Sequence, residues 1–453
     1  MQSIDPLSER FNRIGRWPSH VPFVERPRAM KKLVIIVACL LLLVISFGNA
    51  QQKILINMDL KQTDHLKAYG VAYWSLTRGI EVDWLLNYRG GSFLMDYYEF
   101  LAAECRVRDV SFEVLSGSNA AQLYAEVAQE DNNMDAVRLE KAPKVAVYVP
   151  PAFKPWDDAV TLALEYAEIP YDKVWDDEVV TGKLAQYDWL HLHHEDFTGQ
   201  YGKFYRNYGT FPWYIDQQIL YEKEAHKLGY KKVSDEKKAV AHAIRDYVGN
   251  GGFMFAMCSA TDSYDIALAA ENVDICDVVY DGDPPDPNAQ SKLDYSKTFA
   301  FENFTLEMNP LIYEYSDIDV PPSEPLPLWD QTTDYFTLFE FSAKYDPVPT
   351  MLTQDHVSVV KGFMGQTTGF KKSLVKRTVV ILAEKEGTDQ MKYLHGNYGR
   401  GTFTFYGGHD PEDYMHAVGD PPTDLSLHKN SPGYRLILNN VLFPAAKKKQ
   451  QKT

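Results

Sequence analysis

Apolar and polar residues alternate with two different periods in the first third of the chain. Short apolar or alternating runs at 53–58, 81–87 and 110–115 predict β-strands, because successive side chains of a strand point to opposite faces. The segments between them repeat apolar residues at helical spacing, as 64–79 does before it ends at a glycine. Strands that alternate with helices predict a small parallel sheet, so we expect residues 51–142 to form an N-terminal α/β domain.

The same alternation resumes after Pro143 and continues to residue 446. Predicted strands occupy 144–149, 171–175, 187–194 and the run FMFAM before Cys258, and later the runs DYFTLFEF, TVVILAE and GRGTFTFY. Predicted helices include 155–169, the segment SDEKKAVAHAIRDYV with Ser234 as its N-cap, and SPGYRLILNNVLF with Ser431 as its N-cap. This order predicts an α/β domain over 143–446, with an open, mostly parallel sheet flanked by helices, as in flavodoxin-like folds.

Two stretches interrupt the pattern of the second domain. Residues 197–233 begin with the aromatic run FTGQYGKFYRNYGTFPWY, and residues 281–350 contain the acidic, proline-rich runs DGDPPDPNAQ and VPPSEPLPLWD. Both are predicted to be insertions on the surface of the domain. The last residues, 447–453, are rich in lysine and glutamine and are expected to form a short basic tail.

The start of the chain has the pattern of a secretory signal. Met30 is followed by two lysines, then by an apolar run from Leu33 to Phe47 and by Gly48-Asn49-Ala50. This order predicts translation from Met30, export, and cleavage after Ala50, with no stable membrane anchor left on the mature protein. We therefore treat 1–50 as an N-terminal extension with a signal peptide and expect the protein in the periplasm or outside the cell.

The net negative charge of the chain argues against nucleic acids and anionic membranes as partners. The formal net charge is −16, and it becomes −20 without residues 1–50, which carry seven Lys or Arg and three Asp or Glu. Such a chain repels the phosphates of nucleic acids and anionic membrane surfaces. The expected ligand is therefore a small molecule, a glycan or a peptide.

Reactive side chains follow three of the predicted strands. One strand ends at Cys258, one at His193-His194-Glu195, and one at His409-Asp410-Pro411-Glu412. Because the carboxyl ends of parallel strands meet at one edge of a sheet, we expect these groups to lie together. A helix is predicted to start directly after Cys258, and its N-terminus lowers the pKa of a nearby thiol. Cys258 is thus a candidate nucleophile with His409 as its base, whereas Cys105 and Cys276 lie in apolar patterns typical of core residues.

These residues resemble the active site of the class I glutamine amidotransferase-like fold. That family has a G-x-C-x-G turn and, after a later strand, a His-Pro-Glu motif; here the turn is Ala256 to Ala260, and the motif is His409-Asp410-Pro411-Glu412, one residue longer. The resemblance covers about 143–415. It implies a Cys-His hydrolase of an amide or ester, with Cys258, His409 and Glu412 as catalytic residues and with His193, His194, Glu195 and Ser259 around the substrate and its oxyanion.

A second resemblance extends over nearly the whole mature chain. The segments HLKAYGVAYW, VDWLLNYRGGSF, YDWLHLHHEDFTGQYGKF and FAMCSATDSYDIALAAE are similar to those of an exported Bacteroidetes family that carries the label asparagine synthetase B. The label implies a glutamine-hydrolysing, ATP-dependent synthetase. Such an enzyme needs an N-terminal cysteine and an S-G-G-x-D-S loop, whereas this mature chain begins at Gln51 and its nearest loop is RGGSF at 89–93. We therefore expect no ATP-dependent amide synthesis.

Two other functions fit the same residues. His191, His193, His409, Asp410 and His416 offer nitrogen and carboxylate ligands that suit zinc and a metal-dependent hydrolase, and Asp281, Asp283 and Asp286 offer oxygens that suit calcium. If Cys258 has no catalytic role and no cofactor is present, the aromatic insertion instead suits a non-catalytic module that binds a sugar or peptide.

Overall fold

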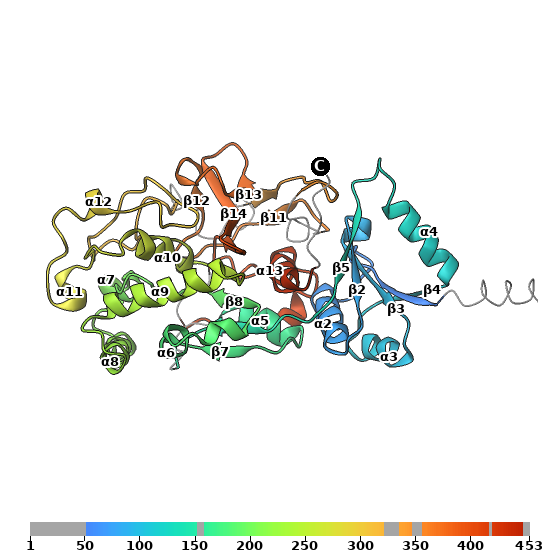
Figure 1. The fold of residues 1–453 in the computed structure, drawn as a ribbon, viewed down its shortest axis with the longest axis horizontal. Coiled ribbons are helices and arrows are strands. Elements are labelled where there is room, and N and C mark those ends of the chain that lie inside the picture. Colours follow the sequence, from blue (N-terminus) through green and yellow to red (C-terminus); the bar gives the residue numbers. More distant parts are fainter. Residues whose placement is uncertain (1–50, 152–157, 321–334, 347–355, 416–418, 447–453) are drawn as a thin grey trace, which may run out of the picture. The chain divides into compact units, whose positions relative to one another are not determined.

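Two sheets organise the chain from Gln51 onward, which forms one compact unit. A computed structural model describes residues 51–151, 158–320, 335–346, 356–415 and 419–446 (Figure 1). The predicted signal region, His416 and the basic tail lie outside these residues. No helix in the described ranges is both long and apolar enough to cross a membrane. The expected α/β class is confirmed, because helices flank sheets that contain parallel strands.

The first sheet has the strand order β4-β1-β3-β2-β5, and all its strand pairs are antiparallel. The parallel arrangement expected for 51–142 is therefore wrong. The sequence analysis missed two strands, β3 and β5, and described the start of β3 only as part of the loop RGGSF at 89–93. Because β2 and β3 are joined by a short turn at 87–91, they form a hairpin. The strands are β1 (Lys53–Ile56), β2 (Val82–Leu86), β3 (Ser92–Asp96), β4 (Glu113–Leu115) and β5 (Asp135–Leu139).

Helices cover both faces of this sheet. Alternate residues of β1 separate the faces: Ile54 and Ile56 belong to the apolar cluster that includes the first two helices, whereas Leu55 packs in the cluster of the third. The first helix begins after Asp64, whose side chain accepts a hydrogen bond from the amide of Lys67. These helices are α2 (His65–Thr77), α3 (Glu99–Val107) and α4 (Gly117–Val127).

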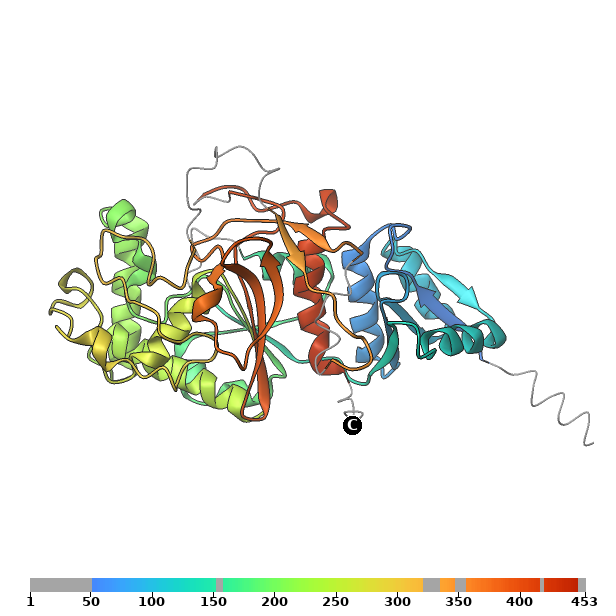
Figure 2. The same cartoon turned by 90° about the horizontal axis from the view of Figure 1, so that it is seen from above.

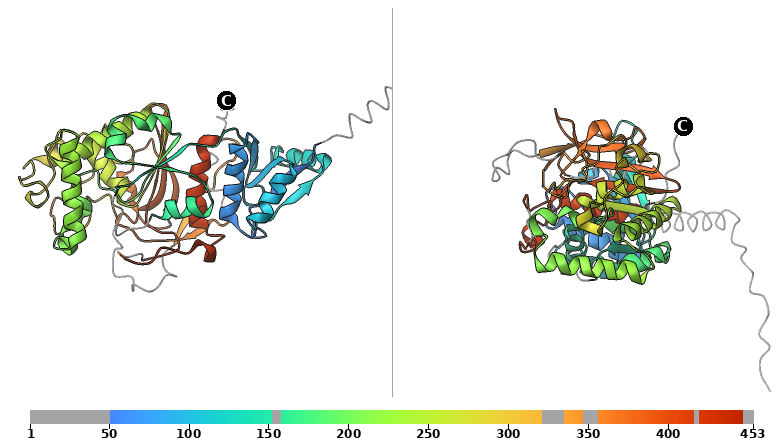
Figure 3. Two further views of the ribbon diagram at one scale, coloured as in Figure 1. Left: turned by 90° about the horizontal axis from the view of Figure 1, so that it is seen from below. Right: turned by 90° about the vertical axis from the view of Figure 1, so that its left-hand side faces the viewer.

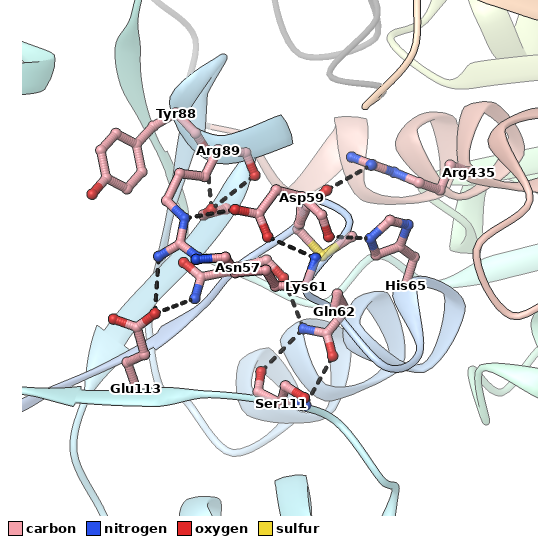
Figure 4. Close-up of polar contacts among 12 residues, drawn as sticks. Asn57, Asp59, Lys61, Gln62, His65, Tyr88, Arg89, Ser111, Glu113 and Arg435 are labelled. Atoms are coloured by element: carbon pink, nitrogen blue, oxygen red, sulfur yellow. Dashed lines mark hydrogen bonds and ion pairs between the residues drawn. The ribbon is translucent and has the colours of Figure 1, made fainter.

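A polar network fixes the loop after β1 against the turn of the hairpin (Figure 4). The guanidinium of Arg89 binds Asp59 at 2.8 Å and Glu113 at 2.9 Å. Arg435, from the last helix, is fully buried and donates to the carbonyl of Met58 at 3.0 Å and to that of Gly90. The loop RGGSF therefore has a structural role in joining the first sheet to the rest of the chain.

The second sheet is half parallel and half antiparallel. Its strands lie between the red C-terminal helix and the green and yellow helices (Figure 2). The strand order is β11-β10-β13-β14-β15-β9-β8-β6-β7, with β12 paired to β14. The pairs from β15 to β7 are parallel and the others are antiparallel. The strands are β6 (Val145–Tyr148), β7 (Asp172–Val174), β8 (Trp189–Leu192), β9 (Phe253–Met257), β10 (Tyr335–Leu338), β11 (Val359–Lys361), β12 (Phe370–Lys371), β13 (Val380–Lys385), β14 (Gln390–Tyr398) and β15 (Gly401–Tyr406).

Two layers of helices bury this sheet. Phe255 faces the cluster of α5 (Ala159–Tyr166) and α13 (Pro432–Leu442), and its neighbour Met254 faces the cluster of α9 (Val233–Gly249) and α10 (Ser259–Ala269). Helix α13 also packs beside α2 (Figure 3). Between these two helices, the hydroxyl of Tyr69 donates to Asn439. The remaining helices are α6 (Asp176–Val180), α7 (Tyr205–Tyr208), α8 (Pro212–Lys227), α11 (Val278–Asp281) and α12 (Ala289–Lys292).

The two N-cap predictions have different outcomes. Ser431 caps α13, because its hydroxyl accepts from the amide of Tyr434 at 3.4 Å. The prediction for Ser234 is wrong: α9 begins at Val233, Lys232 occupies the N-cap position, and Ser234 is a buried residue of the first turn. Val233 packs in the apolar core, so the helix begins one residue before Ser234, although the serine side chain is the better N-cap.

Candidate functional site

Three adjacent parallel strands bring the predicted reactive groups to one edge of the second sheet. Leu192 of β8 lies opposite Ala256 of β9, and Tyr406 of β15 lies opposite Met257. The residues that follow these positions are His193, Cys258 and the Gly407-Gly408-His409 segment. The edge predicted from the sequence therefore exists.

Cys258 connects β9 to α10 in a strained conformation. Its backbone has φ 51° and ψ −140°, a region that residues with a side chain rarely occupy, and α10 begins at the next residue. Holding such a conformation costs on the order of 1–3 kcal/mol. Ala256 and Ala260 are fully buried, and the amide of Ala260 donates to the carbonyl of His193 at 3.0 Å. The small residues on either side and this hydrogen bond thus hold the turn in place.

The thiol of Cys258 is surrounded by backbone amides. The amide of Gln366 lies 3.3 Å from Sγ, and those of Ser259 and Thr367 also favour the thiolate. Even so, the pKa of the thiol is raised to about 11, mainly by burial and in smaller part by the carboxyl of Asp262. The expectation of a lowered pKa is therefore wrong, because Cys258 is only 3% exposed and loss of hydration outweighs the helix N-terminus.

A loop that the sequence analysis did not single out closes over Cys258. This loop, 364–369, is held by the Gln366 side-chain amide, which donates to the carbonyl of Gly202 at 2.7 Å, and by the Thr367 hydroxyl, which donates to Asp262 at 2.9 Å. The carbonyl of Met364 accepts from the amide of His409 at 3.0 Å. The loop thus contacts both the nucleophile and the base candidate. Its glycine-rich sequence, GFMGQTTGF, was the available signal.

Three histidines gather next to this loop. The nitrogens of His193, His194 and His409 that could bind a metal lie within 4.8 Å of one another. The ring centres of His193 and His409 are 4.5 Å apart, and those of His194 and His409 are 5.9 Å apart. His193 and His409 were predicted as metal ligands, whereas His194 was predicted to contact the substrate. The structure therefore adds His194 to the candidate metal site.

Asp158 contacts two of the predicted histidines and orients their rings. Its carboxylate lies 3.0 Å from Nδ1 of His193 and 3.1 Å from Nε2 of His191. Burial alone would raise the pKa of Asp158, but the two imidazoles hold it well below its usual range. The sequence analysis missed Asp158, although it follows β6 and precedes α5, the kind of position that supplied the other candidates.

Two residues of the predicted oxyanion region are also buried here. Burial raises the pKa of Glu195 to about 7, and its Oε2 accepts from the amide of His193 at 2.9 Å. Ser259, the first residue of α10, is fully buried, and its hydroxyl has no hydrogen-bond partner within the described ranges. Its amide follows the nucleophile directly, where it can support a developing oxyanion.

The acidic residues after His409 bind other groups. Oε2 of Glu412 lies 3.0 Å from Nδ1 of His428. Asp410 accepts from the amide of Glu412 at 2.8 Å and from the hydroxyls of Thr423 and Tyr434. Asp410 thus fixes the loop that follows His409, and it belongs to none of the candidate metal-binding groups among the described residues.

The acidic loop expected to suit calcium is neutralised by lysines. The ammonium of Lys232 lies 3.1 Å from Asp281 and 2.6 Å from Asp283, and Lys292 pairs with Asp286. Lys232 therefore pairs with two of the three carboxylates expected to bind calcium, and Lys292 pairs with the third.

Comparisons with known proteins give no family. No protein-family model matches the chain, and no curated protein matches it. Among solved structures, the cytoplasmic proteins STM3548 and STM1381 of Salmonella typhimurium are 11% and 12% identical; each match covers 67% of this chain and 100% of the other, with TM-scores of 0.33 and 0.34. Gan42B, a GH42 β-galactosidase from G. stearothermophilus, is 11% identical over 59% of this chain and 28% of its own, with a TM-score of 0.26.

Proposed function

We propose that the protein is an exported Cys-His hydrolase of the glutamine amidotransferase-like type, which cleaves an amide or ester through a thioester on Cys258. The observation that carries this proposal is the backbone of Cys258, at φ 51° and ψ −140° between β9 and α10. A strained, non-glycine residue between a strand and a helix is the geometry of a nucleophile turn, and strain of this kind persists at functional sites.

The chemistry requires a base, because a thiol with a pKa of about 11 is neutral at pH 7. His409 takes the proton as Sγ attacks the carbonyl carbon, and the amide of Ser259 supports the oxyanion. The tetrahedral species collapses to a thioester as the leaving amine or alcohol receives that proton. Water then attacks the thioester, gives a proton to His409, and releases the acid and the free thiol.

Hydrolysis of p-nitrophenyl acetate, a small activated ester, tests this function. Cys258→Ala is expected to abolish turnover and His409→Ala to reduce it by about 100-fold, the usual contribution of a general base. Cys276→Ala is the matched control, because Cys276 is a buried cysteine that bonds the carbonyl of Thr198 and is expected to leave turnover unchanged. Full activity of Cys258→Ala would overturn the proposal.

A second candidate function rests on the three-histidine cluster. Three imidazoles with a further carboxylate behind one of them form a donor set that suits zinc, and zinc would activate a water molecule for hydrolysis. Zinc titration of the purified protein followed by metal analysis tests it. One zinc per chain that is lost in His194→Ala, together with zinc-dependent turnover that survives in Cys258→Ala, would favour this candidate over the thiol mechanism.

A further inference from the structure

A cavity opens beside His194 at the carboxyl edge of the second sheet. Its volume is about 670 Å³, within the size range of small-molecule sites. The walls come from the Pro150–Pro151 segment after β6, the residues that follow His194, the turn at 201–204, and one side of α8. Because His194 also belongs to the three-histidine cluster, the cavity adjoins the place where the proposed chemistry occurs.

The side chains of the cavity combine negative charge with aromatic surface. The lining includes three carboxylates and no lysine or arginine among the described residues; the acids are Glu195, Asp196 and Asp216. Four aromatic rings complete the lining, from Tyr201, Phe204, Trp213 and Tyr221. Carboxylates and aromatic faces both attract an organic cation.

Two buried lysines near the cavity, Lys203 and Lys237, bind other groups of the protein. The ammonium of Lys203 donates to the carbonyls of Glu307 and Asn309, at 2.7 and 3.1 Å. The ammonium of Lys237 lies 2.6 Å from Asp176, which neutralises it behind the ring of Tyr221. Neither lysine is among the described residues that line the cavity.

Glu195 is the residue that points to a ligand. It is 6% exposed and lines the cavity. Its Oε2 accepts from the amide of His193 at 2.9 Å, which fixes the carboxyl group beside the end of β8. A carboxyl group that is fixed in this way at a cavity wall offers its remaining acceptor positions to a donor of the ligand.

We propose that this cavity binds a cationic group of the substrate, an ammonium or a guanidinium. The proposal rests on the proposed function, in that the carbonyl attacked by Cys258 belongs to the same substrate. Binding places the cation between the rings and the carboxylates of Glu195 and Asp216. A neutral sugar ring would use the aromatic faces equally well, but it would gain no Coulomb attraction from the acidic side chains of the wall.

Calorimetric titration with three small probes tests the cavity separately from catalysis. The probes are n-butylguanidinium, its neutral analogue n-butylurea, and methyl glucoside, and the proteins are wild type and Cys258→Ala. The guanidinium is expected to bind both proteins equally and about tenfold more tightly than the urea, because one charge–aromatic or charge–carboxylate contact contributes that much. Asp216→Asn is expected to weaken it several-fold. Glu222→Gln, an exposed acid on the same helix outside the cavity, is the control and should leave binding unchanged.

The outcomes separate the two proposals. Binding of guanidinium to Cys258→Ala without any ester turnover by the wild type would retain the cation site and refute the hydrolase. Equal binding of guanidinium and urea, preferential binding of methyl glucoside, or no binding of any probe would overturn the cation site, whatever the turnover.

Discussion

At the scale of single residues, the argument depends on Cys258. A non-glycine residue at φ 51° and ψ −140° is rare, and its strain is sustained by the fully buried Ala256 and Ala260 on either side. The same burial keeps the thiol protonated at neutral pH, despite the amides of Gln366 and Thr367 near Sγ. The backbone strain of Cys258 and the protonation of its thiol both follow from its burial. Each leads to a prediction that can be measured.

Strain predicts an unusual order of stability among variants of Cys258. Glycine adopts this backbone conformation freely, whereas alanine retains the strain, so Cys258→Gly is expected to be more stable than Cys258→Ala by about 1 kcal/mol. Urea unfolding measures the difference. At Cys276, which lacks a positive φ, the order should be reversed. A glycine variant of Cys258 that is less stable than the alanine variant would show that the turn is not strained.

Protonation predicts the pH dependence of alkylation. Because the reactive species is the thiolate and the pKa of Cys258 is raised to about 11, its fraction ionised rises with pH over the whole range below that value. The rate of iodoacetamide labelling in the folded protein is expected to rise about tenfold per pH unit from pH 7 to 10. Peptide mass mapping assigns the label. A rate that levels off below pH 9 would contradict the raised pKa.

At the scale of elements, the loop 364–369 contacts both the nucleophile and the segment of the base candidate. A β-carbon at Gly365 would lie 2.9 Å from the carbonyl carbon of Gly408 and from the amide nitrogen of His409, so this backbone approach requires glycine. The loop joins β11 to β12 and holds Gln366 over Cys258 through the carbonyl of Gly202.

Gly365→Ala is therefore expected to displace the His409 segment and to lower ester turnover at least about tenfold, because misplaced catalytic groups lose rate steeply. Gly249→Ala is the control: its β-carbon would meet only the ring of Tyr398 at 3.4 Å, an ordinary contact. Stopped assays and circular dichroism would be compared for both variants. Unchanged turnover in Gly365→Ala would show that the loop does not position His409.

The spacing of apolar residues predicted the helices and strands that bury one face or their whole length. It failed for strands that form only because of their partners in the sheet. The strand before Cys258 is buried along its whole length, so its apolar run was clear. The strand Ser92–Asp96 begins inside the segment RGGSF, whose glycines are typical of a loop, and only its pairing with β1 and β2 makes it a strand. Because β3 pairs with both β1 and β2, it separates the two strands that the sequence pattern places side by side.

At the scale of the whole molecule, the site combines residues from distant parts of the chain. Asp158, His193, Cys258 and His409 follow β6, β8, β9 and β15, and the rule that reactive groups lie beyond strand ends predicted three of them. Gln366 comes from an irregular loop, and no local pattern tells which strand end a loop will cover. The pairing of Glu412 with His428 is likewise a tertiary contact.

The beginning of the chain supplies a prediction about location. The Lys31–Ala50 pattern predicts export and cleavage, so N-terminal sequencing of the protein from its native cells should begin at Gln51. An intact Met1 on cytoplasmic protein would contradict export. In that case an assay with aspartate, glutamine, ATP and magnesium becomes informative, and asparagine that depends on all four would restore the synthetase function.

The central claim is that Cys258 forms a covalent acyl intermediate. The most direct measurement is mass spectrometry of the protein quenched in acid during turnover of p-nitrophenyl acetate. We predict one acetyl group per chain, located on the peptide that contains Cys258, with longer persistence in His409→Ala because water attack on the thioester loses its base. An acetyl group on any other residue, or turnover with no adduct on Cys258 in either protein, would contradict the account.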